Sequence, residues 1–260
     1  MKHRARKRFG QNFLTDAVII DRIVAAINPK AGDKLVEIGP GHGALTKQLL
    51  PITGIMDVIE LDRDLIPELQ AFYTELGQLT VHQADALQFN FSQLSHEPKN
   101  LRVVGNLPYN ISTPLIFHLL SQKDCINDMH FMLQKEVVER LSANPGDKNY
   151  GRLSVMAQYH CQVDYLFLVP PDAFQPQPKV DSAIVRLVPY AALPCVANNE
   201  RLFADVVRQA FSQRRKTLRN TLKSLISAEQ LSEQGISPQQ RPEQLSVEEF
   251  VRIANHIDKI

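Results

Sequence analysis

The 260-residue chain is 44% hydrophobic and 22% charged with a net charge of +1, a composition that excludes a wholly disordered protein and allows one α/β domain with a smaller appendage. Its three widely spaced cysteines, Cys125, Cys161 and Cys195, argue against a disulfide framework or a zinc knuckle and point to a reducing cytoplasm. No apolar run approaches the roughly 20 residues of a membrane span, and no signal-peptide pattern follows the basic N-terminus, so we expect neither membrane insertion nor export.

Short apolar runs rich in strand-forming residues alternate with helical patterns over the first 150 residues. The expected strands are 35–38, 55–61, 79–82, 102–105 and 129–133, and the expected helices are 44–50, 63–74, 114–120 and 135–141. This alternation predicts an α/β fold in which crossover helices join parallel strands. A helix-like stretch follows residue 150, and two late strands, 163–169 and 183–188, predict an antiparallel hairpin that closes the sheet.

A domain boundary is expected near residue 190. Residues 189–199 hold two prolines, two asparagines and several alanines, which is typical of a linker. Beyond it, apolar residues recur at helical spacing near 202–211 and again near 247–254. The sequence therefore predicts a catalytic domain over 1–190 and a small all-helical C-terminal domain over 191–260.

Positive charge is concentrated in two segments, 2–8 and 206–228, and neither contains an acidic residue. Together they hold 11 of the 29 basic residues, which leaves 18 basic against 28 acidic residues elsewhere. Concentrated cations on an acidic body indicate phosphate contacts with a nucleic acid, although two solvated helical faces remain the alternative. The candidate RNA-binding residues are Arg4, Arg6, Lys7, Arg8, Arg214, Arg215, Lys216 and Arg219.

The first predicted strand runs into a glycine-rich turn that begins at Gly39, as in nucleotide-binding α/β domains. Glu60 ends the next strand 21 residues later, where a carboxylate can accept hydrogen bonds from two ribose hydroxyls, with Asp62 as a competitor. Asp85 ends the third strand and can accept the amine of an adenine while Leu87 lines its ring, or can instead cap a helix. These residues favour a nucleoside cofactor.

The fourth predicted strand ends in the segment Gly105–Tyr109. The N6 amine of adenine is a poor nucleophile because its lone pair is delocalised into the ring. The Asn106 side-chain oxygen and the Leu107 carbonyl can each accept one N6 hydrogen, while Pro108 holds that carbonyl outward. Tyr109 adds a flat face for stacking. A strand-end turn with a buried tyrosine is the alternative, but after the glycine turn and the two acids this segment favours methylation of an adenine amine.

Further motifs are residues 7–14 (KRFGQNFL), 171–182 (PDAFQPQPKVDS) and 211–220 (FSQRRKTLRN). With the glycine turn and Asn106–Tyr109, they make the chain resemble, from end to end, the small-subunit ribosomal RNA adenine N6,N6-dimethyltransferases of the KsgA/RsmA type. The resemblance implies a Rossmann-like S-adenosylmethionine methyltransferase sheet. It also implies that the target, methylated during ribosome biogenesis, is two adjacent adenosines near the 3′ end of the small-subunit RNA. Finally, it implies that Phe174 faces Tyr109 across the target base. Monomer is the default oligomeric state. The implied cofactor contacts are Asn12, Leu14, Gly39, Gly41, Glu60, Asp85, Ala86 and Asn106.

A sulfonium methyl group is already activated, so transfer requires positioning and a free lone pair rather than a catalytic histidine, cysteine or metal. Four other functions share part of this sequence pattern. Large-subunit adenine dimethyltransferases of the macrolide-resistance type look unlike this chain over 211–222, and DNA adenine methyltransferases usually have proline where this chain has Leu107. A nicotinamide dehydrogenase leaves Asn106–Tyr109 without a role. A ribosome-assembly factor that binds RNA, with methylation secondary, remains compatible with the sequence.

Overall fold

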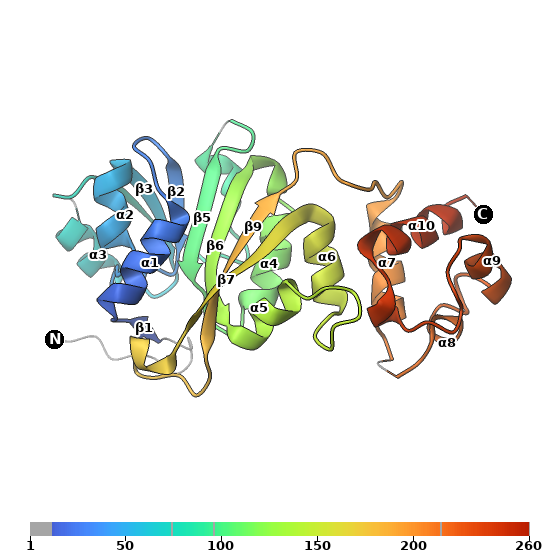
Figure 1. Ribbon diagram of the computed structural model, residues 1–260. Helices are drawn as coiled ribbons and strands as arrows, with labels where there is room; N and C mark the ends of the chain where they lie inside the picture. Colours follow the sequence, from blue (N-terminus) through green and yellow to red (C-terminus); the bar gives the residue numbers. More distant parts are fainter. Residues whose placement is uncertain (1–11, 74, 96, 214, 260) are drawn as a thin grey trace. The chain divides into compact units, whose positions relative to one another are not determined.

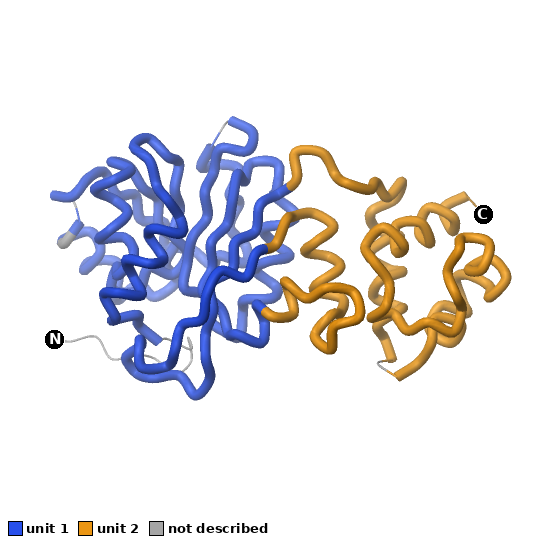
Figure 2. Tube along the Cα trace, viewed as in Figure 1, with its two compact units in different colours: residues 1–138, 164–189 blue, residues 139–163, 190–260 orange. Residues whose placement is uncertain are grey.

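The computed structural model describes residues 12–73, 75–95, 97–213 and 215–259 (Figure 1). It divides into two compact units, drawn in two colours in Figure 2. The first unit contains the described residues up to Val138 together with Asp164–Pro189, and the second contains Glu139–Val163 together with the residues from Tyr190 onward. One unit boundary thus falls next to the boundary expected near residue 190. The segment Glu139–Val163, which the sequence analysis assigned to the first domain, groups instead with the second unit.

The first unit is built on a seven-stranded sheet with the strand order β4-β3-β2-β5-β6-β9-β7. Five strands are parallel: β2 (Lys34–Ile38), β3 (Ile55–Glu60), β4 (Gln78–Gln83), β5 (Leu101–Asn106) and β6 (Ile126–Gln134). Strand β9 (Ser182–Pro189) is antiparallel to β6 and lies between it and β7 (Cys161–Val169). The predicted strands and the predicted α/β class are therefore confirmed, and the two late strands lie side by side at one edge.

Helices α2 (Thr46–Thr53), α3 (Ile66–Tyr73) and α4 (Ser112–Leu120) join parallel strands, as the sequence predicted. The predicted helix α5 (Lys135–Leu141) follows β6. An additional helix, α1 (Ala17–Ile27), precedes the first sheet strand and was not predicted. Its buried residues Ile19, Ile23 and Ile27 recur every four positions, and the Asp16 carboxylate caps its first turn by accepting from Ile19 N at 3.0 Å.

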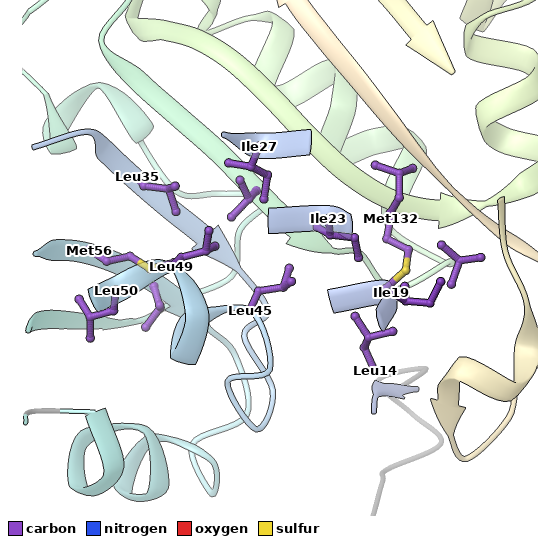
Figure 3. Packing of buried hydrophobic residues seen from close by; sticks show 14 of the residues in the cluster. Leu14, Ile19, Ile23, Ile27, Leu35, Leu45, Leu49, Leu50, Met56 and Met132 are labelled. Carbon is purple, nitrogen blue, oxygen red and sulfur yellow. The ribbon is translucent and has the colours of Figure 1, made fainter. Parts of the chain in front are cut away.

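A hydrophobic cluster packs α1 and α2 against the sheet (Figure 3). The cluster is buried, because its labelled members are all 7% exposed or less. Removing this much apolar surface from water is the main favourable term in holding the layers together. The labelled members are Leu14, Ile19, Ile23, Ile27, Leu35, Leu45, Leu49, Leu50, Met56 and Met132. Because Leu14 belongs to this cluster, the segment that precedes α1 is held at the sheet.

Arg102 on β5 stabilises the C-terminal end of α1. That helix has no basic residue in its own last turn, so its final carbonyls need an external donor. Arg102 Nη2 donates to the Ile27 carbonyl at 2.6 Å, and the same guanidinium contacts Asp33 at 2.6 Å and Asp128 at 2.8 Å. These bonds join α1, β5 and β6 at the end of the sheet opposite Asn106.

Within the second unit, every regular element from residue 191 to residue 259, residue 214 aside, is helical, as predicted for the C-terminal domain. These α-helices are α7 (Glu200–Ala210), α8 (Leu218–Thr221), α9 (Ala228–Glu233) and α10 (Val247–Ile257). Helix α6 (Arg152–His160) packs against α7 and α10, and the rings of Tyr159 and Phe203 lie 4.4 Å apart. This packing explains why Glu139–Val163 belongs to the second unit rather than to the sheet.

Candidate active site

One cavity lies at the carboxyl ends of β2, β3 and β5, next to the loop that follows β4 and the segment Asn12–Leu14. Parallel strands bring the residues that follow them to a single edge of the sheet, where α/β proteins bind ligands. All the residues that the sequence analysis assigned to the cofactor line this cavity: Asn12, Leu14, Gly39, Gly41, Glu60, Asp85, Ala86 and Asn106. Leu107, Pro108 and Tyr109 line it too, whereas Leu87 does not.

The glycine turn between β2 and α2 needs glycine for two reasons. Gly41 and Gly43 have φ angles of 59° and 75°, in the left-handed region that side chains rarely adopt. A Cβ atom at Gly43 would also collide with the ring of Tyr73, whose hydroxyl donates to the His42 carbonyl at 2.7 Å. At Gly39, by contrast, an added Cβ would meet no protein atom within 4 Å. The turn is therefore packed closely against Tyr73 at Gly43, whereas there is open space beside Gly39.

Glu60 at the end of β3 accepts hydrogen bonds from the backbone of two neighbouring segments. Its side chain is buried, with Oε2 accepting from Gly41 N at 3.4 Å and Oε1 accepting from Asp62 N at 2.7 Å. Burial raises the pKa of Glu60, and the backbone hydrogen bonds partly oppose this rise. Asp62 is buried and lines the cavity as well. The choice between Glu60 and Asp62 as the ribose acceptor therefore stays a prediction in favour of Glu60.

Glu37 is a cavity residue that the sequence analysis missed. It lies on β2, is 2% exposed, and its Oε2 accepts a hydrogen bond from the Thr46 hydroxyl at 2.6 Å. Burial raises the pKa of Glu37 from 4.5 to about 7, and the Thr46 hydrogen bond opposes part of that rise. A signal was present in the sequence, because an acidic residue inside an otherwise apolar strand is unusual.

Asp85 does not cap a helix, which was the alternative that the sequence left open, but closes a turn instead. Its Oδ1 accepts from Leu87 N at 2.9 Å, which closes the turn after β4. The residue nevertheless lines the cavity together with its neighbour Ala86, which is 7% exposed. Turn capping and a place at the cavity wall are thus compatible, since a carboxylate has two oxygens and several acceptor positions.

Two hydrogen-bond acceptors lie side by side in the chain where β5 enters the cavity. Asn106 Nδ2 donates to the Asn12 carbonyl at 3.0 Å, which leaves the amide oxygen on the opposite side of the same planar group. Leu107 N donates to the Met132 carbonyl at 3.1 Å. Among the described residues, none donates a hydrogen bond to the Asn106 side-chain oxygen or to the Leu107 carbonyl. Both oxygens can therefore accept from a ligand.

The two aromatic residues expected at the target site have different surroundings. Tyr109 lines the cavity, and its hydroxyl forms a hydrogen bond of 2.9 Å with the hydroxyl of Ser182. Phe174 lies on β8 (Phe174–Gln175), which pairs with β1 (Phe13–Leu14), and it is 2% exposed within the hydrophobic cluster. It is not a lining residue of the cavity. Its role opposite Tyr109 stays a prediction, and one that requires the ring to leave this packed position.

The predicted RNA-binding residues are only partly described. Arg4, Arg6, Lys7, Arg8 and Arg214 lie outside the described residues. Arg215, Lys216 and Arg219 are exposed in the second unit, around the start of α8. Nearby, Arg208 forms an ion pair of 3.0 Å with Asp205, which reduces the free positive charge of α7. Phosphate binding by these side chains stays a prediction.

Two further kinds of feature are absent from the described residues. No group of three or more His, Cys, Asp and Glu side chains in these ranges is arranged to hold a metal ion. No helix within the described part of the chain is both long and apolar enough to cross a membrane. None of the three cysteines, all of which are described, forms a disulfide, and Cys125 and Cys161 are buried.

Known proteins resemble this chain over nearly its whole length. A family model described as ribosomal RNA adenine dimethylase matches residues 2–259. A ribosomal RNA small subunit methyltransferase A from Marinomonas sp. is 60% identical, over 99% of this chain and 97% of the relative. A solved dimethyladenosine transferase from Plasmodium falciparum has a TM-score of 0.81 and 30% identity, over 93% of this chain and 95% of that one. The 23S rRNA methyltransferase ErmE, at 24% identity, a TM-score of 0.76 and coverage of 95% and 100%, shares the fold.

Proposed function

The chain belongs to the ribosomal RNA adenine dimethylase family and is therefore a ribosomal RNA adenine dimethyltransferase, and on that premise we propose that its target is two adjacent adenosines near the 3′ end of small-subunit ribosomal RNA. The relatives at about 60% identity carry a small-subunit name, which favours this RNA over the large-subunit target. The likeness to ErmE supports only the fold. The observation that carries the mechanism is the pair of acceptor oxygens on Asn106 and Leu107 at the cavity.

The cavity fits S-adenosylmethionine as the methyl donor. The open side of Gly39 leaves room for a ligand next to the backbone. The carboxylates of Glu60, which is buried, and Asp85, which is half-buried, line the cavity and can accept hydrogen bonds from hydroxyl and amine groups of a nucleoside. When bound, S-adenosylmethionine supplies a methyl group on a positively charged sulfur, already activated for transfer. Asn12 and Leu14 close the same cavity from the segment before α1.

Asn106 and Leu107 prepare the target amine. The Asn106 side-chain oxygen and the Leu107 carbonyl each accept one N6 hydrogen, which favours a more tetrahedral nitrogen and localises its lone pair. The Asn106–Asn12 hydrogen bond of 3.0 Å holds the amide in the orientation that this requires. Tyr109 stacks on the adenine face. The chain thus acts by orienting the base and by excluding water.

Each transfer needs no catalytic base. Asn106 and Leu107 would hold the N6 lone pair toward the methyl group that bound S-adenosylmethionine would supply, and the sulfur of the donor would keep the electron pair of the bond to that methyl group. The nitrogen, now cationic, then releases one proton to water. Because neither the Asn106 amide nor the Leu107 carbonyl titrates, proton removal is not assigned to any side chain.

The RNA is held mainly by basic side chains that take no part in orienting the reacting amine. We assign phosphate contacts to the basic segment at 2–8 and to Arg214, Arg215, Lys216 and Arg219 in the second unit. The protein acts as a monomer in the cytoplasm during ribosome biogenesis. A role in subunit assembly is compatible with the same contacts, and the experiment below separates RNA binding from chemistry.

The substitution Asn106→Ala tests the mechanism. It deletes a hydrogen bond that strengthens as the amine becomes tetrahedral, so single-turnover methylation of immature small subunits should slow on the order of a hundredfold or more at saturating S-adenosylmethionine. RNA affinity should barely change. Asn100→Ala, at the opposite end of β5 where the side chain makes a surface hydrogen bond to Glu97, is the matched control. A near wild-type rate in Asn106→Ala would refute the mechanism, and a parallel loss of RNA binding would make Asn106 a structural residue.

A further inference from the structure

Ser182 is the buried partner of the tyrosine that lines the cavity. Its hydroxyl lies 2.9 Å from the Tyr109 hydroxyl, and the residue is fully buried at the start of β9. Tyr109 belongs to the loop after β5, 73 residues earlier in the chain. Burial raises the pKa of Tyr109 above its ordinary value of 10.0, so this hydrogen bond persists across neutral pH.

Both ends of Tyr109 are therefore fixed. Its main chain lies in a turn where the Ser112 hydroxyl donates to the Tyr109 carbonyl at 3.2 Å, and Ile111 N donates to the Pro108 carbonyl at 3.1 Å. Ser182 fixes the far end of the ring, and its own backbone is in register with Gln134 on the neighbouring strand β6. A tyrosine held at its backbone and at its hydroxyl has little freedom to move the long axis of its ring, and this axis sets where the stacking face lies.

We propose that Ser182 is a positioning residue that fixes the long axis of the Tyr109 ring and thereby favours the second methyl transfer over release of a monomethylated adenine. The proposal rests on the function proposed above, in which Tyr109 stacks on the target base. It assigns Ser182 a place in product specificity, although its side chain need not touch the RNA or the cofactor.

The two transfers place different demands on the ring. In the first, the amine has two hydrogens and both acceptors, Asn106 and Leu107, can hold it. After one methyl group has been added only one hydrogen is left, so a single acceptor orients the nitrogen. The stacking face of Tyr109 then carries a larger share of the orientation. Loosening the ring should therefore slow the second transfer more than the first.

The test is a time course of mono- and dimethylated adenine in small-subunit RNA, measured by mass spectrometry under single-turnover conditions with saturating S-adenosylmethionine. Ser182→Ala should slow the second transfer relative to the first on the order of three- to tenfold, as expected for loss of one hydrogen bond. Tyr109→Phe removes the same bond from the other side and should give a similar shift. The double variant should show no further shift, because the two hydroxyls act through one bond.

Ser154→Ala is the matched control, since Ser154 is a fully buried serine of the second unit that donates to the Arg140 carbonyl. A general loss of stability lowers both transfers together and leaves their ratio unchanged, as expected for this control. If the wild type dimethylates and neither Ser182→Ala nor Tyr109→Phe alters the ratio, the proposal fails while the proposed function stands. Effects that multiply in the double variant would also overturn it. A wild type that never methylates adenine would instead overturn the proposed function.

Discussion

Replacing Glu37 with glutamine should stabilise the ligand-free protein, by an amount that grows as the pH rises. Glu37 is 2% exposed, and burial raises its pKa from 4.5 to about 7. Between these two values the folded protein holds a proton that the unfolded chain has released, so this group's contribution to stability falls as the pH rises. From below pH 4.5 to above pH 7 the loss amounts to about 3 kcal/mol. Glutamine cannot ionise, and its carbonyl can still accept from Thr46.

The free energy of unfolding should be measured by urea denaturation of both proteins, without cofactor, from about pH 5 to about pH 8. The difference between variant and wild type should increase with pH by about 2–3 kcal/mol, since part of the transition lies outside this window. Glu75→Gln, at an exposed position, provides the control for the loss of a carboxylate as such. A constant difference for Glu37→Gln would show that the buried carboxyl ionises like an exposed one and would refute the reasoning.

Two further predictions concern RNA binding and chemistry. The triple substitution of Arg214, Arg215 and Lys216 by alanine should weaken binding to RNA of any sequence and leave cofactor affinity unchanged. The slope of the logarithm of RNA affinity against the logarithm of salt concentration should decrease by roughly 0.7–0.9 for each lost phosphate contact. An unchanged slope would show that this segment does not contact the RNA. The single-turnover rate at saturating RNA and cofactor should be nearly flat from about pH 6 to about pH 9, because the acceptors on Asn106 and Leu107 do not titrate and Glu37, which does, accepts from Thr46 rather than from the amine. A bell-shaped profile that persists in Glu37→Gln would reveal a missed acid or base.

The location of the cavity was predictable because it follows from parallel topology. Gly39, Glu60, Asp85 and Asn106 each stand at or just after the end of one of four successive strands, and parallel pairing brings those ends to one edge. Buried strands also carry strong local signals, since β-branched and aliphatic residues dominate them. Recognising the ends of these four strands in the sequence is therefore enough to predict that the four residues lie together.

Features that depend on distant pairing could not be predicted in this way. β1 and β8 contain two residues each, too few to show a periodic pattern of apolar residues. They pair although they lie near opposite ends of the first unit's sequence. Tyr109 and Ser182 are 73 positions apart, and no feature of the sequence around either residue indicates that they are in contact. The burial of Phe174 follows from that same short pairing. Helix α1 is different, because the spacing of Ile19, Ile23 and Ile27 did carry a signal.

The pairing of β1 with β8 also sets an order of events during synthesis of the chain. Thr15 donates to the carbonyl of Ala173, which is added 158 residues later. At about 5–20 residues per second, the ribosome needs roughly 8–30 s to supply that partner. For this interval the nascent segment around Phe13 and Leu14 has no strand to pair with, and Leu14, which is 6% exposed in the finished protein, remains accessible to water and to chaperones. The wall that this segment contributes to the cavity is consequently among the last parts of the first unit to form.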